Sequence, residues 1–336
     1  MKILLTHSPS DLANYYGLRA LATLQAAGTV RLRSFEGPWA LEALIEAAQD
    51  CQLIVSHRST AAPAELLARL PNLVAFSRCA VDIRNVDVQA ASQLGILVTQ
   101  ASPGFVTSVT EWIVGAMIDV SRNITNAAMD YRAGRTPAAA MGRELRGATL
   151  GIIGLGRIGQ NLVDVALALG MRVVGHDPYL AAAKPGVQML GFEALLGQAD
   201  YVVCLAVATE ATENMIDAKA LARMKPDAVF INPGRGNLVD EAALLAALEA
   251  GHLGGCALDV GRAPDQMPSP ALARHPRVLA TPHIGGLTLP AMEHQSMETA
   301  QQAADLAAGK VPVGAVNASE AFRAARFLAQ RGQVGA

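Results

Sequence analysis

The sequence is poor in cysteine, and its cysteines are not arranged to act together. Cys51, Cys79, Cys204 and Cys256 are the only four in 336 residues, and no two of them form a C-x-x-C pair. This spacing argues against a disulfide framework, a redox motif or a zinc site. Because three of the four lie in or beside apolar runs, we expect buried free thiols and no bound metal.

The chain also lacks a long apolar segment and a strong excess of charge of either sign. No apolar run approaches the length of about 18 residues typical of a membrane span, and the run after Met1 is too short for a signal peptide. A formal net charge of −2 gives no electrostatic footprint for nucleic acid or an anionic membrane. We therefore expect a cytoplasmic protein that binds neither.

Apolar sequence, in contrast, is abundant. The chain is 51% hydrophobic and 17% charged, which is enough for two packed cores, and its length favours two domains. Strand-like and helix-like runs alternate along the whole chain, as is typical of parallel sheets covered by helices.

In the first part of the chain we expect strands at 2–5, 53–56, 73–77 and 96–99, with helices at 39–49 and 64–70. This part has no glycine fingerprint, so its ligand should not be a dinucleotide. A long amphipathic helix is expected at 107–131, bridging to the second part. A final helix at 290–308 is long enough to return to the first domain, which would make that domain discontinuous.

The second part opens with an apolar run at 149–153 that leads into a glycine turn ending at Gly159. Three glycines at this spacing permit a tight turn, bring backbone N–H groups close to a pyrophosphate, and let the next helix pack closely. The ligand then lies at a helix N-terminus, which favours an anion. G-x-G-x-x-G alone is weak evidence for a dinucleotide site in a chain with 30 glycines. Its context strengthens the prediction, because it is followed by an expected helix at 160–169, a terminating Gly170 and an expected strand at 171–175.

Asp177 follows that second strand, close to the spacing of about 20 residues after the glycine turn that dinucleotide-binding folds use. A carboxylate there can accept hydrogen bonds from the ribose hydroxyls of adenosine and would repel a 2′-phosphate, so it favours NAD over NADP. The alternative is a turn residue before Pro178.

Further strands are expected at 201–205, 228–231, 255–258 and 278–280, with helices at 192–196, 218–224 and 241–250. Three polar residues follow these strands at the carboxyl edge of the sheet, where such sheets bind ligands. Arg235 can present a planar fork to a carboxylate. His283, between a proline and two glycines, suits acid/base chemistry near neutral pH. Asp259 can accept a hydrogen bond from the nicotinamide carboxamide.

Each of these three residues has a structural alternative. Arg235 could be an exposed loop arginine, His283 a hydrogen-bonded loop histidine, and Asp259 a strand-end turn residue. The other histidines lack comparable settings and are interpreted as structural: His7, His57, His176, His252, His275 and His294.

The motifs together resemble the NAD-dependent D-isomer-specific 2-hydroxyacid dehydrogenases in order and spacing. They are the glycine turn with Asp177, Pro-Gly-Arg-Gly at 233–236 with Leu-Val-Asp-Glu at 238–241, Ala-Leu-Asp-Val at 257–260 and Thr-Pro-His-Ile-Gly-Gly at 281–286. The match runs from about residue 72 to about residue 288.

The resemblance implies an α/β fold of two Rossmann-like, doubly wound parallel-sheet domains with an interdomain cleft. Residues 1–103 with 288–336 would form the substrate domain and 104–287 the NAD-binding domain, usually assembled as a homodimer through the latter. Arg235 would bind and polarise the substrate, His283 would be the acid/base, and Asp259 would contact nicotinamide. The cofactor contacts that the resemblance implies are Gly154, Leu155, Gly156, Arg157, Ile158, Gly159, Asp177, Val207, Thr212, Pro233, Gly234, Asp259, His283 and Gly285.

The chain departs from the family at two places. Family members carry a catalytic glutamate five residues after the aspartate of Ala-Leu-Asp-Val, and here that residue is Pro264. Our hypothesis is that Asp265, the next residue, orients His283 instead.

The second departure is in the family's glycine-rich substrate loop, which corresponds to residues 79–87. Asp82 replaces a usual glycine, and Arg84 an aspartate. Backbone N–H groups of Val81 and Asp82 could still hold a carboxylate. The side chains of Arg58 and Arg78 either add positive charge to the substrate site or are surface residues.

The expected activity is reversible hydride transfer between NAD(H) and a small 2-oxo or 2-hydroxy acid. Two alternatives stay open. One is a 3-phosphoglycerate-type dehydrogenase, although the chain leaves no room for the regulatory domain that many of these carry. The other is a non-catalytic NAD-sensing protein similar to the dehydrogenase-like corepressors, which the missing glutamate favours and the presence of Arg235 and His283 opposes.

Overall fold

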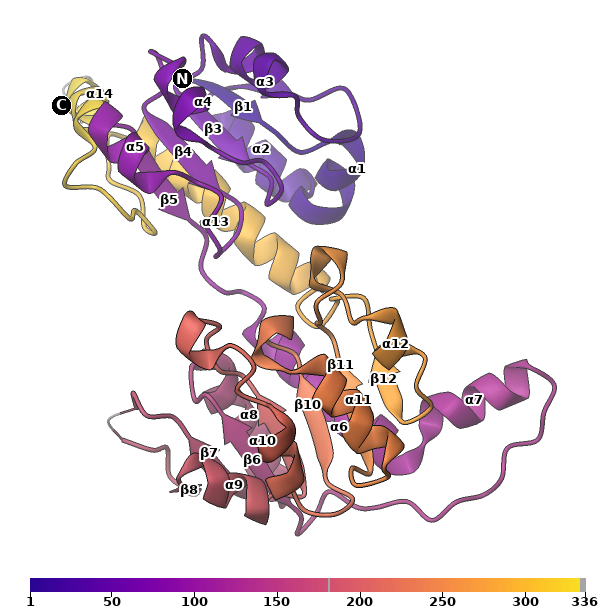
Figure 1. Cartoon of the computed structure of the whole chain (residues 1–336). Helices are drawn as coiled ribbons and strands as arrows, with labels where there is room; N and C mark the ends of the chain where they lie inside the picture. The colour runs from indigo at the N-terminus through magenta and orange to yellow at the C-terminus, as the bar shows by residue number, and fades with distance from the viewer. Residues whose placement is uncertain (181, 333–336) are drawn as a thin grey trace. The chain divides into compact units, whose positions relative to one another are not determined.

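The structure is a computed structural model that describes residues 1–180 and 182–332, without the side chain of Asp265 (Figure 1). The chain divides into two compact units. Unit 1 comprises Met1–Gly104 together with the described residues from Leu289 onward, and unit 2 is Phe105–Thr288. Both divisions lie one residue after the boundaries expected from the sequence.

Unit 1 is built on a five-stranded parallel sheet in the order β2-β1-β3-β4-β5. Its strands are β1 (Lys2–Leu5), β2 (Thr29–Leu32), β3 (Leu53–Ser56), β4 (Ala75–Arg78) and β5 (Leu97–Gln100). The order changes direction between β1 and β3, which makes this pair the topological switch point of the sheet.

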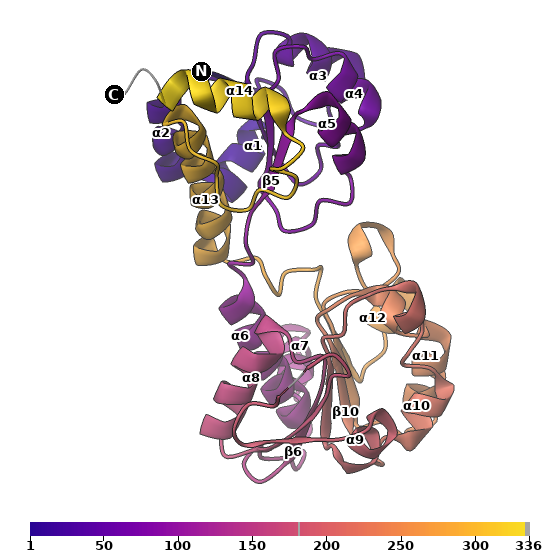
Figure 2. The same ribbon diagram turned by 90° about the vertical axis from the view of Figure 1, so that its left-hand side faces the viewer.

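Helices cover both faces of the unit 1 sheet. Successive side chains of a strand point to opposite faces, and in β1 Ile3 and Leu5 enter one core while Leu4 enters the other. The first core is closed by α2 (Leu18–Ala27), α13 (Leu289–Ala307) and α14 (Phe322–Gly332), with α2 and α13 packed side by side (Figure 2). The second is closed by α3 (Leu41–Ala48), α4 (Ala64–Ala68) and α5 (Val88–Leu94).

Unit 2 contains a seven-stranded parallel sheet in the order β12-β11-β10-β9-β6-β7-β8. The strands are β6 (Thr149–Ile153), β7 (Arg172–His176), β8 (Val187–Met189), β9 (Tyr201–Cys204), β10 (Val229–Asn232), β11 (Gly255–Leu258) and β12 (Val278–Ala280). Six of the seven end beside a residue that the sequence marked as functional, so these residues share one edge of the sheet.

This sheet is also covered on both faces. In β9, Tyr201 and Val203 face the core formed with α6 (Val106–Arg122) and α8 (Arg157–Ala168). The opposite core is formed with α9 (Phe192–Gln198), α10 (Ala218–Arg223), α11 (Glu241–Glu249) and α12 (Pro270–Ala273). The predicted class of two doubly wound α/β sheets is confirmed.

The prediction of one long helix at 107–131 is wrong in one respect, because this segment forms two helices. α6 ends at Asn123, which adopts a left-handed conformation with φ of 54°, and α7 (Ile124–Arg132) follows. Asparagine tolerates this conformation and is a common residue at helix ends. α7 has no buried residue and extends away from the rest of unit 2 (Figure 1).

All four cysteines are buried and free, as predicted. Burial raises the pKa of the Cys79 and Cys204 thiols to about 12. Within residues 1–180 and 182–332 we find no group of histidine, cysteine and acidic side chains placed to hold a metal ion. In the same part of the chain no helix has the length and apolar character that a membrane crossing requires.

Candidate active site

The glycine turn follows β6 and has the geometry that its sequence predicts. Gly154 has φ of 92°, and a Cβ there would lie 2.6 Å from the backbone carbonyl of Leu205. A Cβ on Gly159 would collide with the carbonyl oxygen of Gly154, so only glycine lets α8 approach β6 this closely. Gly156 differs from both, because a Cβ there would meet open space.

The N-terminus of α8 lies at that open space. Gly156 is its N-cap residue, and no side chain caps the helix there. Uncapped N–H groups and the positive end of a 12-residue helix favour a bound anion. The turn therefore fits the pyrophosphate of a dinucleotide, with Leu155 buried behind it and Arg157 exposed.

Asp177 follows β7 and lies against the same turn. Its Oδ2 accepts a hydrogen bond of 2.9 Å from the N–H of Leu155, and its Oδ1 accepts one of 3.0 Å from the N–H of Tyr179. These bonds fix the carboxylate beside the glycine turn, the position required of a ribose-binding acid.

The segment after β9 forms a compact turn around Thr212. The Thr212 hydroxyl donates to the carbonyl of Val207 over 2.7 Å and accepts from the N–H of Thr209 over 2.8 Å. The Val207 side chain is 77% exposed, so the predicted cofactor contact at this position has an accessible apolar surface.

Arg235 is held in place through Asn232, a residue that the sequence analysis did not single out. Asn232 is buried at the end of β10, where its Nδ2 donates to the carbonyl of Arg235 over 2.9 Å and its Oδ1 accepts from the N–H of Gly234 over 3.1 Å. The Arg235 Nη1 donates to the Gly234 carbonyl over 2.8 Å. An asparagine just before Pro-Gly is a recognisable turn signal.

His283 is carried by a loop that Asp259 holds in place. The carboxylate of Asp259, only 2% exposed at the end of β11, accepts from the Thr281 hydroxyl over 2.6 Å and from the N–H groups of Ile284 and Gly285 over 2.8 and 2.7 Å. The Asp259 carbonyl also accepts from the N–H of His283 over 3.0 Å. His283 itself has φ of 56°, an unfavourable conformation that these contacts maintain.

The predicted contact of Asp259 with nicotinamide stays a prediction. A carboxylate offers about four lone-pair sites, and the loop at 281–285 uses three of them. Asp265, the proposed replacement for the family glutamate, has a side chain that lies outside the described residues.

The segment containing Pro264 is anchored by Arg262. Its guanidinium bonds Glu213 over 2.8 Å and the carbonyl of Asn237 over 3.0 Å, and its N–H donates to Glu241 over 2.9 Å. Gly236 lies so close to Gly261 that a Cβ would overlap it. The Arg235 turn and the segment that replaces the family glutamate are thus packed together.

The predicted substrate residues lie in unit 1, after β3 and β4. Arg78 is buried, and its guanidinium donates to the carbonyls of Asp82, His57 and Thr60 over 2.9–3.3 Å. Burial lowers the pKa of Arg78 to about 10. Arg58 is exposed, with its guanidinium carbon 5.9 Å from the centre of the Tyr15 ring.

The loop between β4 and α5 is closed by an ion pair. Asp82 receives hydrogen bonds from both the backbone and the guanidinium of Arg84, the shortest of 2.6 Å. The two residues that depart from the family pattern therefore pair with each other. Val81, beside them, is partly exposed.

Residues 114–285 match the model of the D-isomer specific 2-hydroxyacid dehydrogenase family, NAD-binding domain. The chain belongs to this family. The matched residues lie within unit 2 and include the glycine turn.

Curated relatives extend the similarity beyond the NAD-binding domain. D-3-phosphoglycerate dehydrogenase of Mycobacterium leprae is 34% identical over 303 residues, covering 89% of this chain and 57% of its own. The chain thus spans little more than half the length of this relative. (S)-sulfolactate dehydrogenase of Chromohalobacter salexigens is 39% identical over 251 residues, covering 73% of this chain and 79% of its own.

The whole fold also resembles that of solved structures. D-lactate dehydrogenase from Escherichia coli superposes with a TM-score of 0.80 at 23% identity, covering 94% of this chain and all of that one. At this identity the likeness shows the fold alone.

Proposed function

We propose that the protein transfers a hydride between NAD(H) and a small D-2-hydroxy or 2-oxo acid, with His283 as acid/base and Arg235 as the substrate-binding residue. The observation that carries this proposal is the Asp259 carboxylate at the end of β11. It holds the His283 loop, which follows β12. On the other side of β11 lies β10, whose end carries the Asn232-stabilised turn of Arg235. His283 and Arg235 therefore follow the two strands that flank β11 in one sheet.

The chain's own residues supply charge and a proton. During reduction of a 2-oxo acid, the imidazolium of His283 donates its ring proton to the developing alkoxide oxygen, and the Arg235 guanidinium stabilises the negative charge on that oxygen. Oxidation reverses the proton transfer, with neutral His283 as the base. NAD(H), when bound, supplies or accepts the hydride.

We propose NAD as the cofactor in preference to NADP. Asp177 supports this, because its carboxylate is held beside the glycine turn and would repel a 2′-phosphate. Contacts from Val207, Thr212, Pro233, Gly234 and Gly285 complete the proposed cofactor site.

We propose unit 1 as the substrate domain and unit 2 as the NAD-binding domain. The proposed substrate contacts in unit 1 are the backbone of Val81 and Asp82 and the charges of Arg58 and Arg78. A 3-phosphoglycerate-type substrate remains the second candidate, supported by the similarity to D-3-phosphoglycerate dehydrogenase. The cytoplasmic location and the homodimer are retained as predictions.

The deciding experiment is to mix the protein with NADH or NADPH and a panel of 2-oxo acids and to follow absorbance. We expect NADH oxidation with at least one of glyoxylate, hydroxypyruvate, pyruvate or a bulkier analogue, and much slower reaction with NADPH. His283→Gln should lower kcat by about 10²- to 10⁴-fold, with NADH binding kept. Absence of turnover with every acid would favour the NAD-sensing alternative.

A separate variant tests the role of Asp265. If its carboxylate orients His283, Asp265→Asn should lower kcat and shift the limb of the pH–rate profile that reports the histidine. An unchanged profile with unchanged turnover would assign the orientation of His283 to other residues.

A further inference from the structure

The carboxyl edge of the unit 1 sheet carries basic residues on four neighbouring strands. Arg33 follows β2, His7 follows β1, His57 and Arg58 follow β3, and Arg78 ends β4. His7 and His57 flank the switch point between β1 and β3, where sheets of this order bind their ligands. Their rings lie 5.0 Å apart in an edge-on arrangement.

Two guanidinium groups are buried at this edge with only carbonyl oxygens as hydrogen-bond partners. Arg33 is 8% exposed and donates to the carbonyls of Thr6 and Gly37, and Arg78 is 4% exposed and donates to three further carbonyls. Within the described part of the chain, neither of them forms an ion pair with a carboxylate. Burial of a charge without an ion-pair partner is unfavourable, and it lowers the pKa of both groups, although Asp11 and Glu36 near Arg33 and Asp82 near Arg78 act in the opposite direction. A bound anion would supply the missing countercharge.

Two nitrogen atoms at the same edge also lack a partner. Among the described residues, Nδ1 of His7 and Nε of Arg33 are buried without a hydrogen bond. His7 is only 3% exposed, with its ring centre 4.9 Å from that of Tyr16. Buried polar atoms are nearly always bonded, so these two atoms point to a ligand with several acceptor oxygens.

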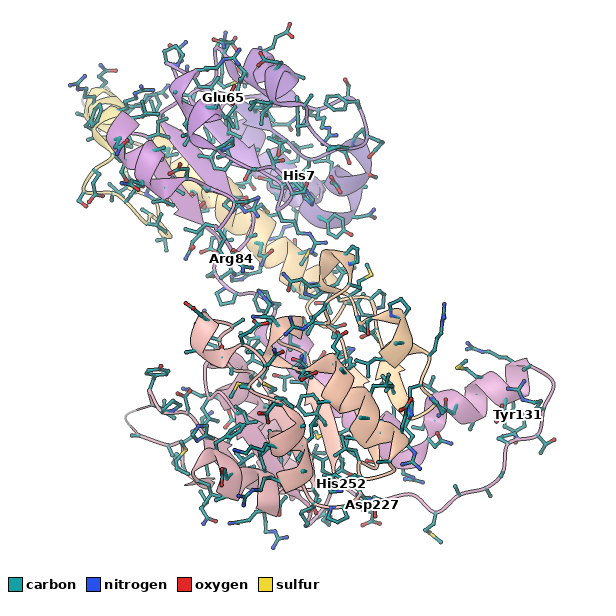
Figure 3. The ribbon with its side chains drawn as sticks, in the orientation of Figure 1. His7, Glu65, Arg84, Tyr131, Asp227 and His252 are labelled. Atoms are coloured by element: carbon teal, nitrogen blue, oxygen red, sulfur yellow. The ribbon has the colours of Figure 1, made fainter. Side chains whose placement is uncertain are left out.

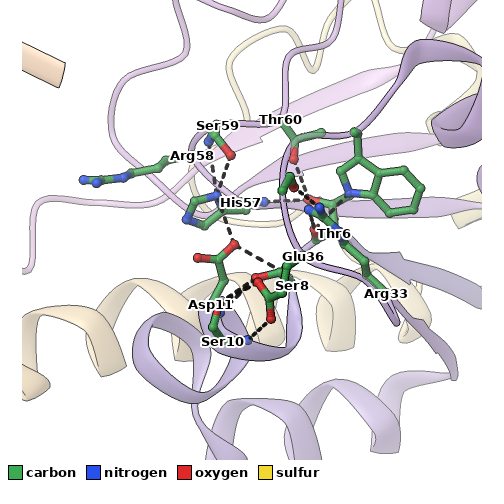
Figure 4. A network of polar contacts seen from close by, with 12 residues as sticks. Thr6, Ser8, Ser10, Asp11, Arg33, Glu36, His57, Arg58, Ser59 and Thr60 are labelled. Carbon is green, nitrogen blue, oxygen red and sulfur yellow. Dashed lines mark hydrogen bonds and ion pairs between the residues drawn. The ribbon is translucent and has the colours of Figure 1, made fainter. Parts of the chain in front are cut away.

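A network of hydrogen bonds holds the edge together (Figure 4). The hydroxyls of Thr6 and Thr60 bond each other over 2.8 Å and join the ends of β1 and β3, while Thr6 Oγ1 also accepts from the N–H of His57 over 2.9 Å. The Thr6 carbonyl accepts from both Arg33 and the Trp39 indole. These contacts fix the guanidinium of Arg33 in advance of binding.

The acidic residues nearby offset these charges only in part, because none of them forms an ion pair with Arg33 or Arg78 within the described residues. Glu36 is bonded by the backbone N–H and the hydroxyl of Ser10 over 2.9 and 2.7 Å. Asp11 caps the short α1 (Pro9–Asp11) and lies 3.9 Å from Nδ1 of His57. Asp82 likewise acts on the charge of Arg78. Within the described residues, Arg33, Arg58 and Arg78 nevertheless form no ion pair with any of these three carboxylates.

We propose that this edge is a subsite for a second anionic group of the substrate, a sulfonate, phosphate or further carboxylate, bound by His7, Arg33, His57 and Arg58. The inference rests on the proposed function and narrows it: the substrate is a 2-oxo or 2-hydroxy acid with a second acidic group, rather than a monoanion such as pyruvate. The three oxygens of a sulfonate or phosphate can accept from Nε of Arg33, from a ring N–H of His7 and from the exposed guanidinium of Arg58.

The kinetic test compares 3-sulfopyruvate, 3-phosphohydroxypyruvate and oxaloacetate with pyruvate. The wild type should prefer at least one of the first three by 100-fold or more in kcat/KM. Arg33→Met should lower kcat/KM for the preferred doubly acidic substrate at least tenfold and should change kcat/KM for pyruvate less than twofold. Arg33→Lys should recover part of the lost kcat/KM. Arg69→Met is the matched control, since Arg69 pairs with Glu42 elsewhere on unit 1. A wild type that prefers pyruvate, or an Arg33 variant equally slow on all acids, would overturn the proposal.

A binding test separates this inference from the proposed function. The melting temperature is measured in sodium sulfate and in sodium chloride at equal ionic strength, because an anion bound only to the folded state stabilises it. Sulfate should raise the melting temperature of the wild type and of Arg69→Met more than that of Arg33→Met, and this difference is the Arg33-dependent gain. If Arg33→Met does not fold, Arg58→Met takes its place in this test, because the Arg58 side chain is exposed.

The outcomes of the two tests are distinct. An Arg33-dependent gain without turnover of any acid would refute the proposed function and keep the anion site. Turnover without that gain and without a preference for doubly acidic substrates would refute the subsite alone. An Arg33-dependent gain combined with a preference for pyruvate would mean that the site binds a free anion and would refute its role in the substrate.

Discussion

Asp259 shows how one buried side chain can position the loop that carries His283. Its carboxylate receives three hydrogen bonds from residues 281–285, and its own backbone carbonyl receives a fourth bond from His283. The unfavourable φ of His283 persists because these contacts are made together. We therefore assign Asp259 a positioning role in addition to its predicted contact with the cofactor.

Replacing Asp259 by asparagine tests this role. The amide NH₂ would face the N–H donors of Ile284 or Gly285 and leave a buried donor unpaired, at a cost of about 1–3 kcal/mol in the free energy of unfolding. We expect kcat to fall at least tenfold, because the His283 loop loses its anchor. Asp217→Asn is the control: it weakens a helix cap elsewhere in unit 2 and should leave kcat unchanged. Equal effects of both variants on kcat would contradict the positioning role.

His7 makes the stability of the protein depend on pH. Burial, and then the nearby His57, lower the pKa of His7 well below 6.5. Below about pH 6.5 the unfolded chain therefore binds a proton that the folded protein does not, and stability is lost as the pH falls, by up to about 1.4 kcal/mol per pH unit. The free energy of unfolding, measured with urea at pH 7, 6 and 5.5, should decrease in that order.

His7→Phe should flatten this decrease. Tyr16→Phe, a change to the ring beside His7, removes no group that titrates in this range and should retain the wild-type slope. The His7 assignment fails if both variants show the same slope as the wild type.

The residues that the sequence identified share one property: each follows an apolar strand within a motif. Arg235, Asp259 and His283 could be placed at a sheet edge because parallel strands end on the same side. His7 and His57 also follow strands but lack a glycine or proline motif, so they were interpreted as structural. Their importance depends on which strands are neighbours, and sheet order cannot be read from local sequence.

At the level of elements, the strands with continuous apolar sequence were predicted, including the edge strands β5 and β12, whereas the edge strands β2 and β8 were not. β2 and β8 each lie at one edge of their sheet and are largely exposed, so their sequences carry little hydrophobic signal. α8 begins at Arg157, inside the glycine motif and three residues before the helix expected at 160–169. The glycines of the motif hid the start of the helix because glycine is a poor helix former.

The junction of β6 and α8 allows a paired test of two glycines. Gly159→Ala places a methyl group against the carbonyl of Gly154 and should cost about 1–3 kcal/mol of stability by forcing the helix from the strand. Gly156→Ala enters open space and should cost less than about 1 kcal/mol. Because that space is where the pyrophosphate is proposed to bind, Gly156→Ala should still weaken NADH binding at least tenfold in a fluorescence titration. Normal NADH affinity in this variant would place the pyrophosphate elsewhere.

At the scale of the whole molecule, α7 is the element that the fold of one chain leaves unexplained. It buries no residue, and its apolar side chains Ile124, Met129 and Tyr131 are 50%, 58% and 67% exposed (Figure 3). Groups of exposed apolar side chains are common at surfaces that contact another molecule. We infer that α7 contributes to the predicted homodimer.

Charge introduced on α7 should separate the subunits. Met129→Glu combined with Tyr131→Glu should convert a dimer into a monomer in analytical ultracentrifugation, because a carboxylate buried in an interface is strongly unfavourable. Leu18→Glu, at a side chain of unit 1 that is 82% exposed, is the control and should leave the dimer intact. A dimer that survives the double change would place the interface away from α7.

Each unit has hydrophobic cores of its own. Both cores of unit 2 are formed by residues between Phe105 and Leu279, and both cores of unit 1 by residues outside that range. Unit 1 depends on two chain segments, because α13 and α14 close one face of its sheet with Leu306 and Leu328. The difference predicts how fragments of the chain behave.

Residues 105–288 expressed alone should unfold cooperatively and bind NADH with a dissociation constant within about tenfold of that of the full chain, because the glycine turn, Asp177 and both cores are present. This fragment should show no turnover, since the proposed substrate contacts are in unit 1.

Residues 1–104 alone should not unfold cooperatively, because one sheet face lacks α13 and α14. Adding residues 289–332 through a linker should restore the cooperative transition. Circular dichroism and NADH fluorescence measure both properties. A fragment of residues 105–288 that folds but does not bind NADH would show that the cofactor site requires unit 1.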